Sequence, residues 1–95
     1  MYVEESELSN TDRYNISKFI YGASLMLIYE NQEKYRDVDC KFEEKTIIDL
    51  NNEPYESYKI ILINFSYAKL EEFFEDMKKL NLKYNGIKLN FISES

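Results

Sequence analysis

The chain has 95 residues, with 18 acids against 12 bases, a net charge of −6, nine tyrosines, one cysteine and no histidine. One cysteine excludes an intramolecular disulfide and a cysteine-rich zinc site, and the lack of histidine excludes Ser-His-Asp and Cys-His catalysis. The negative net charge argues against binding to duplex nucleic acid, because that affinity depends on lysine and arginine.

The length predicts one domain over residues 1–95, and a hydrophobic fraction of 44% is enough for a packed core. Residues 1–9 are rich in acids and are expected to form a loosely ordered arm. The first residues lack the basic start of a signal peptide, and no apolar stretch reaches the roughly 20 residues of a membrane span. These features predict a cytoplasmic protein without membrane contact, and no motif indicates a cofactor.

The first predicted element is a helix that begins at a cap formed by Ser9, Asn10 or Thr11 and continues to about Tyr35. Apolar residues recur along it at spacings of three and four, which is the period of one helix face. The predicted core face consists of Ile16, Phe19, Ile20, Ala23 and Leu27.

Two strands are predicted next, over 38–43 and 46–50, because apolar and polar residues alternate there. Glu43–Lys45 is expected to form the turn between them, and Asn51–Pro54 a second turn. Residues 58–65 carry apolar side chains on both faces, which is typical of a central strand.

Ser66 is expected to cap a second helix, with an apolar stripe from Leu70 to Leu80. Residues 82–92 should close the chain as a strand, or as a hairpin around the Asn85-Gly86 turn signal. The prediction is therefore an α+β fold in the order α-β-β-β-α-β(β). Two helices would pack on a small antiparallel sheet of three to five strands.

The first helix carries a second apolar side, opposite its core face and within an arc of about 120°. Its members are Tyr14, Tyr21, Leu25, Ile28, Tyr29 and Tyr35. A two-layer domain buries one side of such a helix, and tyrosine is frequent in binding hot spots. This side is predicted to bind a larger protein, or a second copy of the chain in a homodimer. The alternative is that the helix lies between the sheet and another part of the chain.

The second helix carries a cluster of acids, namely Glu71, Glu72, Glu75 and Asp76. Carboxylates arranged like phosphates can occupy the basic groove of a nucleic-acid enzyme. The alternative is an ordinary solvated face that keeps the chain soluble.

Catalysis is not predicted, and no catalytic or metal-binding residue is assigned. Cys40 lies on the apolar side of its strand without a histidine base, so it is expected to be a core residue. Asp39-Cys40-Lys41 resembles half of a nuclease signature, with Asp37 on the same strand face. That signature needs another carboxylate on a preceding strand, so a magnesium-dependent nuclease is a remote alternative.

A small, acidic, tyrosine-rich and histidine-free chain is similar in type to phage-encoded inhibitors of host defence, including anti-CRISPR proteins. It is also similar in type to immunity proteins that neutralise nuclease toxins. The analogy implies a non-catalytic inhibitor that docks on a larger protein, such as a nucleic-acid-binding enzyme or an effector complex, without binding nucleic acid directly. No motif connects the chain to one such family.

Overall fold

The computed structural model describes residues 9–89, which form an α+β fold. The order of elements is α1 (Asn10–Glu30), β1 (Asp39–Ile48), β2 (Pro54–Ile63), α2 (Tyr67–Lys79), β3 (Lys83–Tyr84) and β4 (Ile87–Lys88). Residues 1–8 of the predicted acidic arm and residues 90–92 of the predicted last strand lie outside the described residues.

The strands form two separate antiparallel pairs in place of one sheet of three to five strands. Strands β1 and β2 pair without interruption, from Asp39 opposite Ile63 to Ile48 opposite Pro54. Strand β3 pairs with β4 around Asn85-Gly86, where both residues have the positive φ angles that such a tight turn requires. Within residues 9–89 no ladder joins the two pairs.

The predicted turn at Glu43–Lys45 is wrong, because these residues continue β1 and pair with Ser57–Lys59. Charged side chains fit the solvent-facing positions of a strand, so they do not by themselves end it. The chain turns instead just after β1, where Asp49 Oδ1 accepts hydrogen bonds from the backbone N–H groups of Asn51 and Glu53. The β1–β2 hairpin is therefore ten residues long on each side.

Helix α1 begins as predicted, with Ser9 Oγ accepting a hydrogen bond from the Asp12 N–H at 3.1 Å. It ends at Glu30, so the prediction that it continues to Tyr35 is wrong. Residues 30–34 are all polar and offer no apolar side chain to hold another turn against the core. The chain bends at this point, and Tyr35 reaches the core from the connecting loop.

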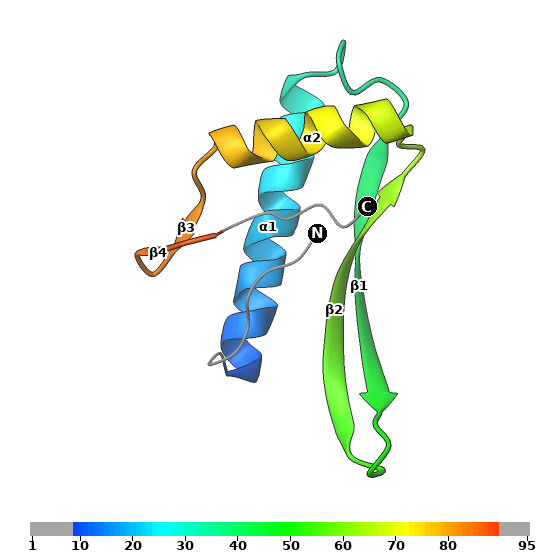
Figure 1. The fold of residues 1–95 in the computed structure, drawn as a ribbon, viewed down its shortest axis with the longest axis vertical. Coiled ribbons are helices and arrows are strands. Elements are labelled where there is room, and N and C mark those ends of the chain that lie inside the picture. Colours follow the sequence, from blue (N-terminus) through cyan, green and yellow to red (C-terminus); the bar gives the residue numbers. More distant parts are fainter. Residues whose placement is uncertain (1–8, 90–95) are drawn as a thin grey trace.

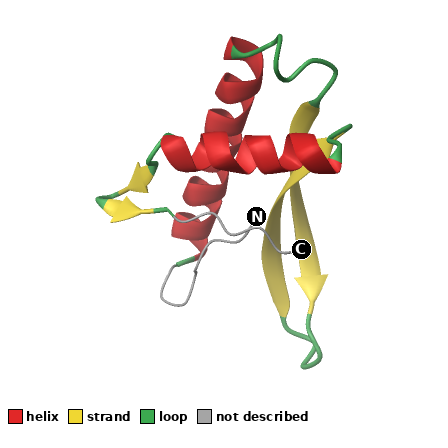
Figure 2. Ribbon diagram, turned by 45° about the horizontal axis from the view of Figure 1, so that its top comes forward, coloured by secondary structure: helices red, strands yellow, loops and turns green. Residues whose placement is uncertain are grey.

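Helix α1 contacts the hairpin along one side and α2 on another. Figure 1 shows the β1–β2 hairpin running alongside α1, with α2 crossing its carboxyl-terminal part, and Figure 2 shows this crossing from a second direction. The buried apolar residues come from α1, α2, the α1–β1 loop, β1 and the chain after β4. They are Ile16, Ile20, Leu27, Ile28, Tyr35, Cys40, Phe73, Phe74, Met77 and Leu89. Two sides of this helix are thus covered by other elements of the described chain.

Gly22 occupies the middle of α1, where glycine costs about 1 kcal/mol of stability relative to alanine. A Cβ atom at this position would have no neighbour within 4 Å. Packing within the described part of the chain therefore gives no reason for a glycine here.

The fold predicts that Tyr21→Glu lowers the free energy of unfolding by about 2 kcal/mol or more, because the carboxylate would be pressed against the Phe42 ring. Urea unfolding followed by circular dichroism measures the change. Tyr29→Glu on the same helix is the control, since Tyr29 is 57% exposed. Its expected effect is below about 0.5 kcal/mol. If the two variants lose the same free energy of unfolding, the hairpin does not cover this side of α1.

Candidate functional site

The six residues predicted to form one exposed side of the first helix lie in different environments. Ile28 and Tyr35 are buried, Tyr14, Tyr21 and Leu25 are half-buried, and Tyr29 is exposed. Together they form no continuous exposed surface.

Two of these tyrosines attach the hairpin to α1. Tyr14 makes edge-to-face contacts with Phe42 and Tyr58, with ring centres 6.0 and 5.4 Å apart. The Tyr21 ring lies 5.9 Å from Phe42, and Phe42 stacks on Tyr58 across the hairpin. Lys18 places its ammonium 4.3 Å from the centre of the Phe42 ring. The tyrosines therefore pack inside the chain, where they hold the hairpin in place.

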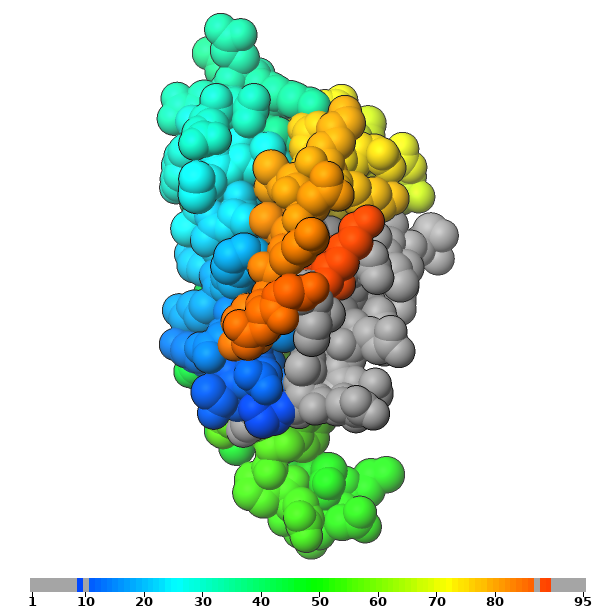
Figure 3. All heavy atoms as spheres, turned by 90° about the vertical axis from the view of Figure 1, so that its left-hand side faces the viewer, coloured from blue at the N-terminus to red at the C-terminus, as the bar shows by residue number. Residues whose placement is uncertain are grey.

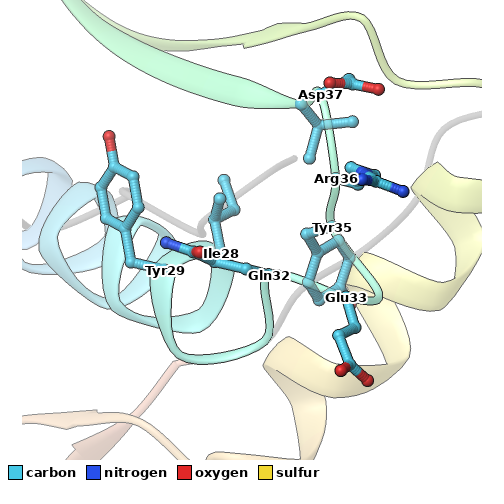
Figure 4. Close-up of a pocket in the computed structure, with 8 residues that line it drawn as sticks. Ile28, Tyr29, Gln32, Glu33, Tyr35, Arg36 and Asp37 are labelled. Carbon is cyan, nitrogen blue, oxygen red and sulfur yellow. The ribbon is translucent and has the colours of Figure 1, made fainter.

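Ile28, Tyr29 and Tyr35 also line an open cavity of about 670 Å³ between the end of α1 and the following loop. Figure 4 shows Tyr29 at one side of this cavity and Arg36 and Asp37 at the other. Its charged groups are of both signs, so its electrostatics select neither an anion nor a cation.

Asp76, one of the four predicted surface acids, holds α2 to the α1–β1 loop. Its Oδ2 accepts hydrogen bonds from Lys34 Nζ at 2.6 Å and from the Tyr35 hydroxyl at 2.5 Å. The bonds from Lys34 and Tyr35 lower the pKa of Asp76 below its ordinary value. Burial raises the pKa of the Tyr35 hydroxyl, and the bond to Asp76 raises it further.

Two of the remaining acids of α2 are also compensated by lysines. Glu72 lies 3.3 Å from Lys69, and Glu75 lies 3.3 Å from Lys78. Glu71 is exposed. The negative charge of this helix face is thus largely neutralised locally, which weakens any resemblance to a row of phosphates.

The residues of the nuclease alternative do not form a metal site. Asp37 lies in the loop before β1 with a φ of 65°, so the prediction that it shares a strand face with Asp39 is wrong. Asp39 Oδ1 accepts the Cys40 N–H at 2.8 Å. Within residues 9–89 no three histidine, cysteine, aspartate or glutamate residues are placed to hold a metal ion. Cys40 is buried as predicted, and burial raises the pKa of its thiol to about 11.

Exposed apolar side chains that the sequence patterns did not reveal lie at the tip of the β1–β2 hairpin, on both of its faces, because Tyr55 is opposite Ile47 and not Ile48. Ile48 is 66% exposed, Tyr55 is 45% exposed, and Leu50 in the turn is fully exposed. Figure 3 shows the tip, in green, projecting beyond the rest of the molecule. The sequence does contain a signal for this exposure. Ile48 and Leu50 stand on either side of Asp49, the residue that caps the turn, and no helix or second sheet can cover the end of a two-stranded hairpin.

A second apolar surface lies on α1, where Phe19 and Ala23 were predicted to be core. An open groove of about 420 Å³ runs between this side of α1 and the segment after α2. Figure 3 shows that segment, in orange, lying along α1. The apolar residues that line the groove are Phe19, Gly22, Ala23, Met26, Leu27, Leu80 and Leu82. Phe19, Met26 and Leu80 are exposed, so the prediction of Phe19 as a core residue is wrong.

No protein-family model matches the chain, and neither a curated protein nor a solved structure matches it. Within the described residues, neither helix combines the length and apolar character needed to cross a membrane.

The bonds of Asp76 predict a specific dependence of stability on pH. Because its pKa is lowered on folding, the ionised carboxylate stabilises the fold above about pH 4, the ordinary aspartate pKa. This stabilisation is lost as the pH falls through the lowered value. Asp76→Asn should cost about 1 kcal/mol at pH 7. The difference from the parent chain should vanish once the carboxylate is protonated in both states.

Urea unfolding at a series of pH values measures this difference. Glu71→Gln, which removes an exposed acid from the same helix, is the control and should leave the pH dependence unchanged. A constant difference between Asp76→Asn and the parent chain at all pH values would argue against the proposed role of the Asp76 charge.

Proposed function

We propose that the chain is a non-catalytic binding protein of the cytoplasm that inhibits or regulates a larger protein. It docks on that protein through the tip of the β1–β2 hairpin. The observation that carries the proposal is the exposure of Ile48, Leu50 and Tyr55 on a projecting, fully paired hairpin. Ile48 and Tyr55 leave opposite faces of the hairpin, so a partner would cover the tip from both sides.

The charges around the tip indicate the chemistry of the partner. Residues 44–56 contain four acids and one lysine. An apolar tip with an acidic rim is complementary to an apolar pocket with a basic rim. Basic surroundings are typical of the substrate grooves of nucleic-acid-binding enzymes and effector complexes. The proposal therefore retains a phage-type inhibitor of host defence, similar in type to anti-CRISPR proteins, with immunity proteins as the related alternative.

Apolar burial is the favoured mechanism of docking over charge mimicry. The acids of α2 were the candidates for mimicry, and Lys34, Lys69 and Lys78 compensate three of them. Paired carboxylates gain less from a basic groove, because binding there first has to separate them from their lysines.

Leu50→Asp tests the docking surface. The partner is first captured from host lysate with the parent chain and identified by mass spectrometry, and its affinity is then measured for each variant. Leu50→Asp should weaken binding by roughly 30-fold or more, because it places a charge in the apolar contact. Unfolding free energies should agree within about 0.5 kcal/mol, since Leu50 is fully exposed.

Tyr67→Asp is the matched control, because Tyr67 is an exposed apolar residue of α2 outside the tip. It should bind like the parent chain. If Leu50→Asp also binds like the parent chain, the tip is not the docking surface.

The salt dependence of the same affinity separates the two mechanisms. Between about 0.05 and 0.5 M salt, docking by apolar burial should lose less than about tenfold in affinity. A steeper loss would favour charge mimicry over the proposed apolar contact.

A further inference from the structure

The side of α1 that lines the groove beside the segment after α2 is separate from the hairpin tip. What binds to this side of α1 therefore does not depend on the proposed function. We propose that this side of α1 binds the same side of a second copy of the chain, with the two helices antiparallel. The exposed apolar residues of the contact are Phe19 and Met26, with Leu80 beside them.

The contact has the pattern of a helix–helix interface. Lys18, Gly22, Met26 and Glu30 are spaced by four residues and form a single row along α1, and all of them line the groove. Rows of this spacing from two helices interlock at a crossing angle of about −50°, the commonest packing class in globular proteins. The groove beside the row gives space for the Met26 side chain of the second copy.

Gly22 supplies the independent observation. No atom within the described residues requires a glycine at this position, although glycine weakens a helix. A helix that crosses over Gly22 from outside can approach the backbone more closely than over any residue with a side chain. The glycine is therefore explained by a helix packed against this row.

The charges at the two ends of the row set the direction of the second helix. Lys18 begins the row and Glu30 ends it, and within residues 9–89 neither has an ion-pair partner, although the Lys18 ammonium lies over the Phe42 ring at the edge of the row. In a twofold-symmetric pair of antiparallel helices, each Lys18 faces Glu30 of the other copy. A parallel pair would place like charges together. The charge pattern thus selects a second copy in the antiparallel arrangement.

Sedimentation equilibrium of the full chain over a range of concentrations tests the dimer. The parent chain should self-associate, and Gly22→Leu should abolish this while circular dichroism shows an intact fold. Ala68→Leu adds the same side chain to an exposed position of α2 and should leave self-association unchanged. A parent chain that stays monomeric up to about 1 mM would overturn the proposal. Self-association that survives in Gly22→Leu would also overturn it.

Charge reversal tests the arrangement. Glu30→Lys should weaken the dimer by about tenfold or more, because two attractive pairs become repulsive. Adding Lys18→Glu should restore the affinity to within about threefold. This substitution also removes the contact between Lys18 and Phe42, so urea unfolding must show that the double variant keeps its fold. A folded double variant that dimerises as weakly as Glu30→Lys would exclude the antiparallel contact. Leu50→Asp should dimerise like the parent chain, and loss of the dimer in that variant would show that the copies meet at the hairpin tip instead.

Discussion

The packing of the β1–β2 hairpin on α1 is the contact on which the rest of the structure depends. A two-stranded hairpin alone in water is marginally stable, so it needs a second layer. Four aromatic rings, from Tyr14, Tyr21, Phe42 and Tyr58, supply that layer with centre-to-centre distances between 5.4 and 6.2 Å. The same contact covers one side of α1 and fixes the direction in which the hairpin tip projects.

A second contact, between α2 and the α1–β1 loop, also holds the fold together. Tyr35 packs edge-to-face on Phe73 with its ring, while its hydroxyl donates to Asp76 at the surface. One residue thus joins the apolar core to a charge-assisted hydrogen bond. The acidic face of α2 therefore contributes to holding the fold.

Local signals in the sequence predicted the α+β class and the helix cap at Ser66. They also limited the first cap to Ser9, Asn10 or Thr11, and gave the Asn85-Gly86 turn as one of two alternatives for the last segment. The candidate site could not be predicted in the same way. A helix with two apolar sides has the same periodicity whether a partner or its own hairpin covers the second side. The bond between Lys34 and Asp76 joins residues 42 positions apart, and the exposure of Phe19 depends on where α2 crosses α1. The bond and the exposure both depend on how the helices and the loop pack in three dimensions, which local sequence patterns do not encode.

The hairpin turn has a consequence for how such a chain can evolve. Its conformation is fixed by Asp49, whose carboxylate binds the backbone of Asn51 and Glu53, and the Leu50 side chain takes no part. Selection can therefore replace the residue at this position without losing the turn. If the tip is the docking surface proposed above, single substitutions at this position change what the chain recognises, while the aromatic layer that supports the hairpin stays the same.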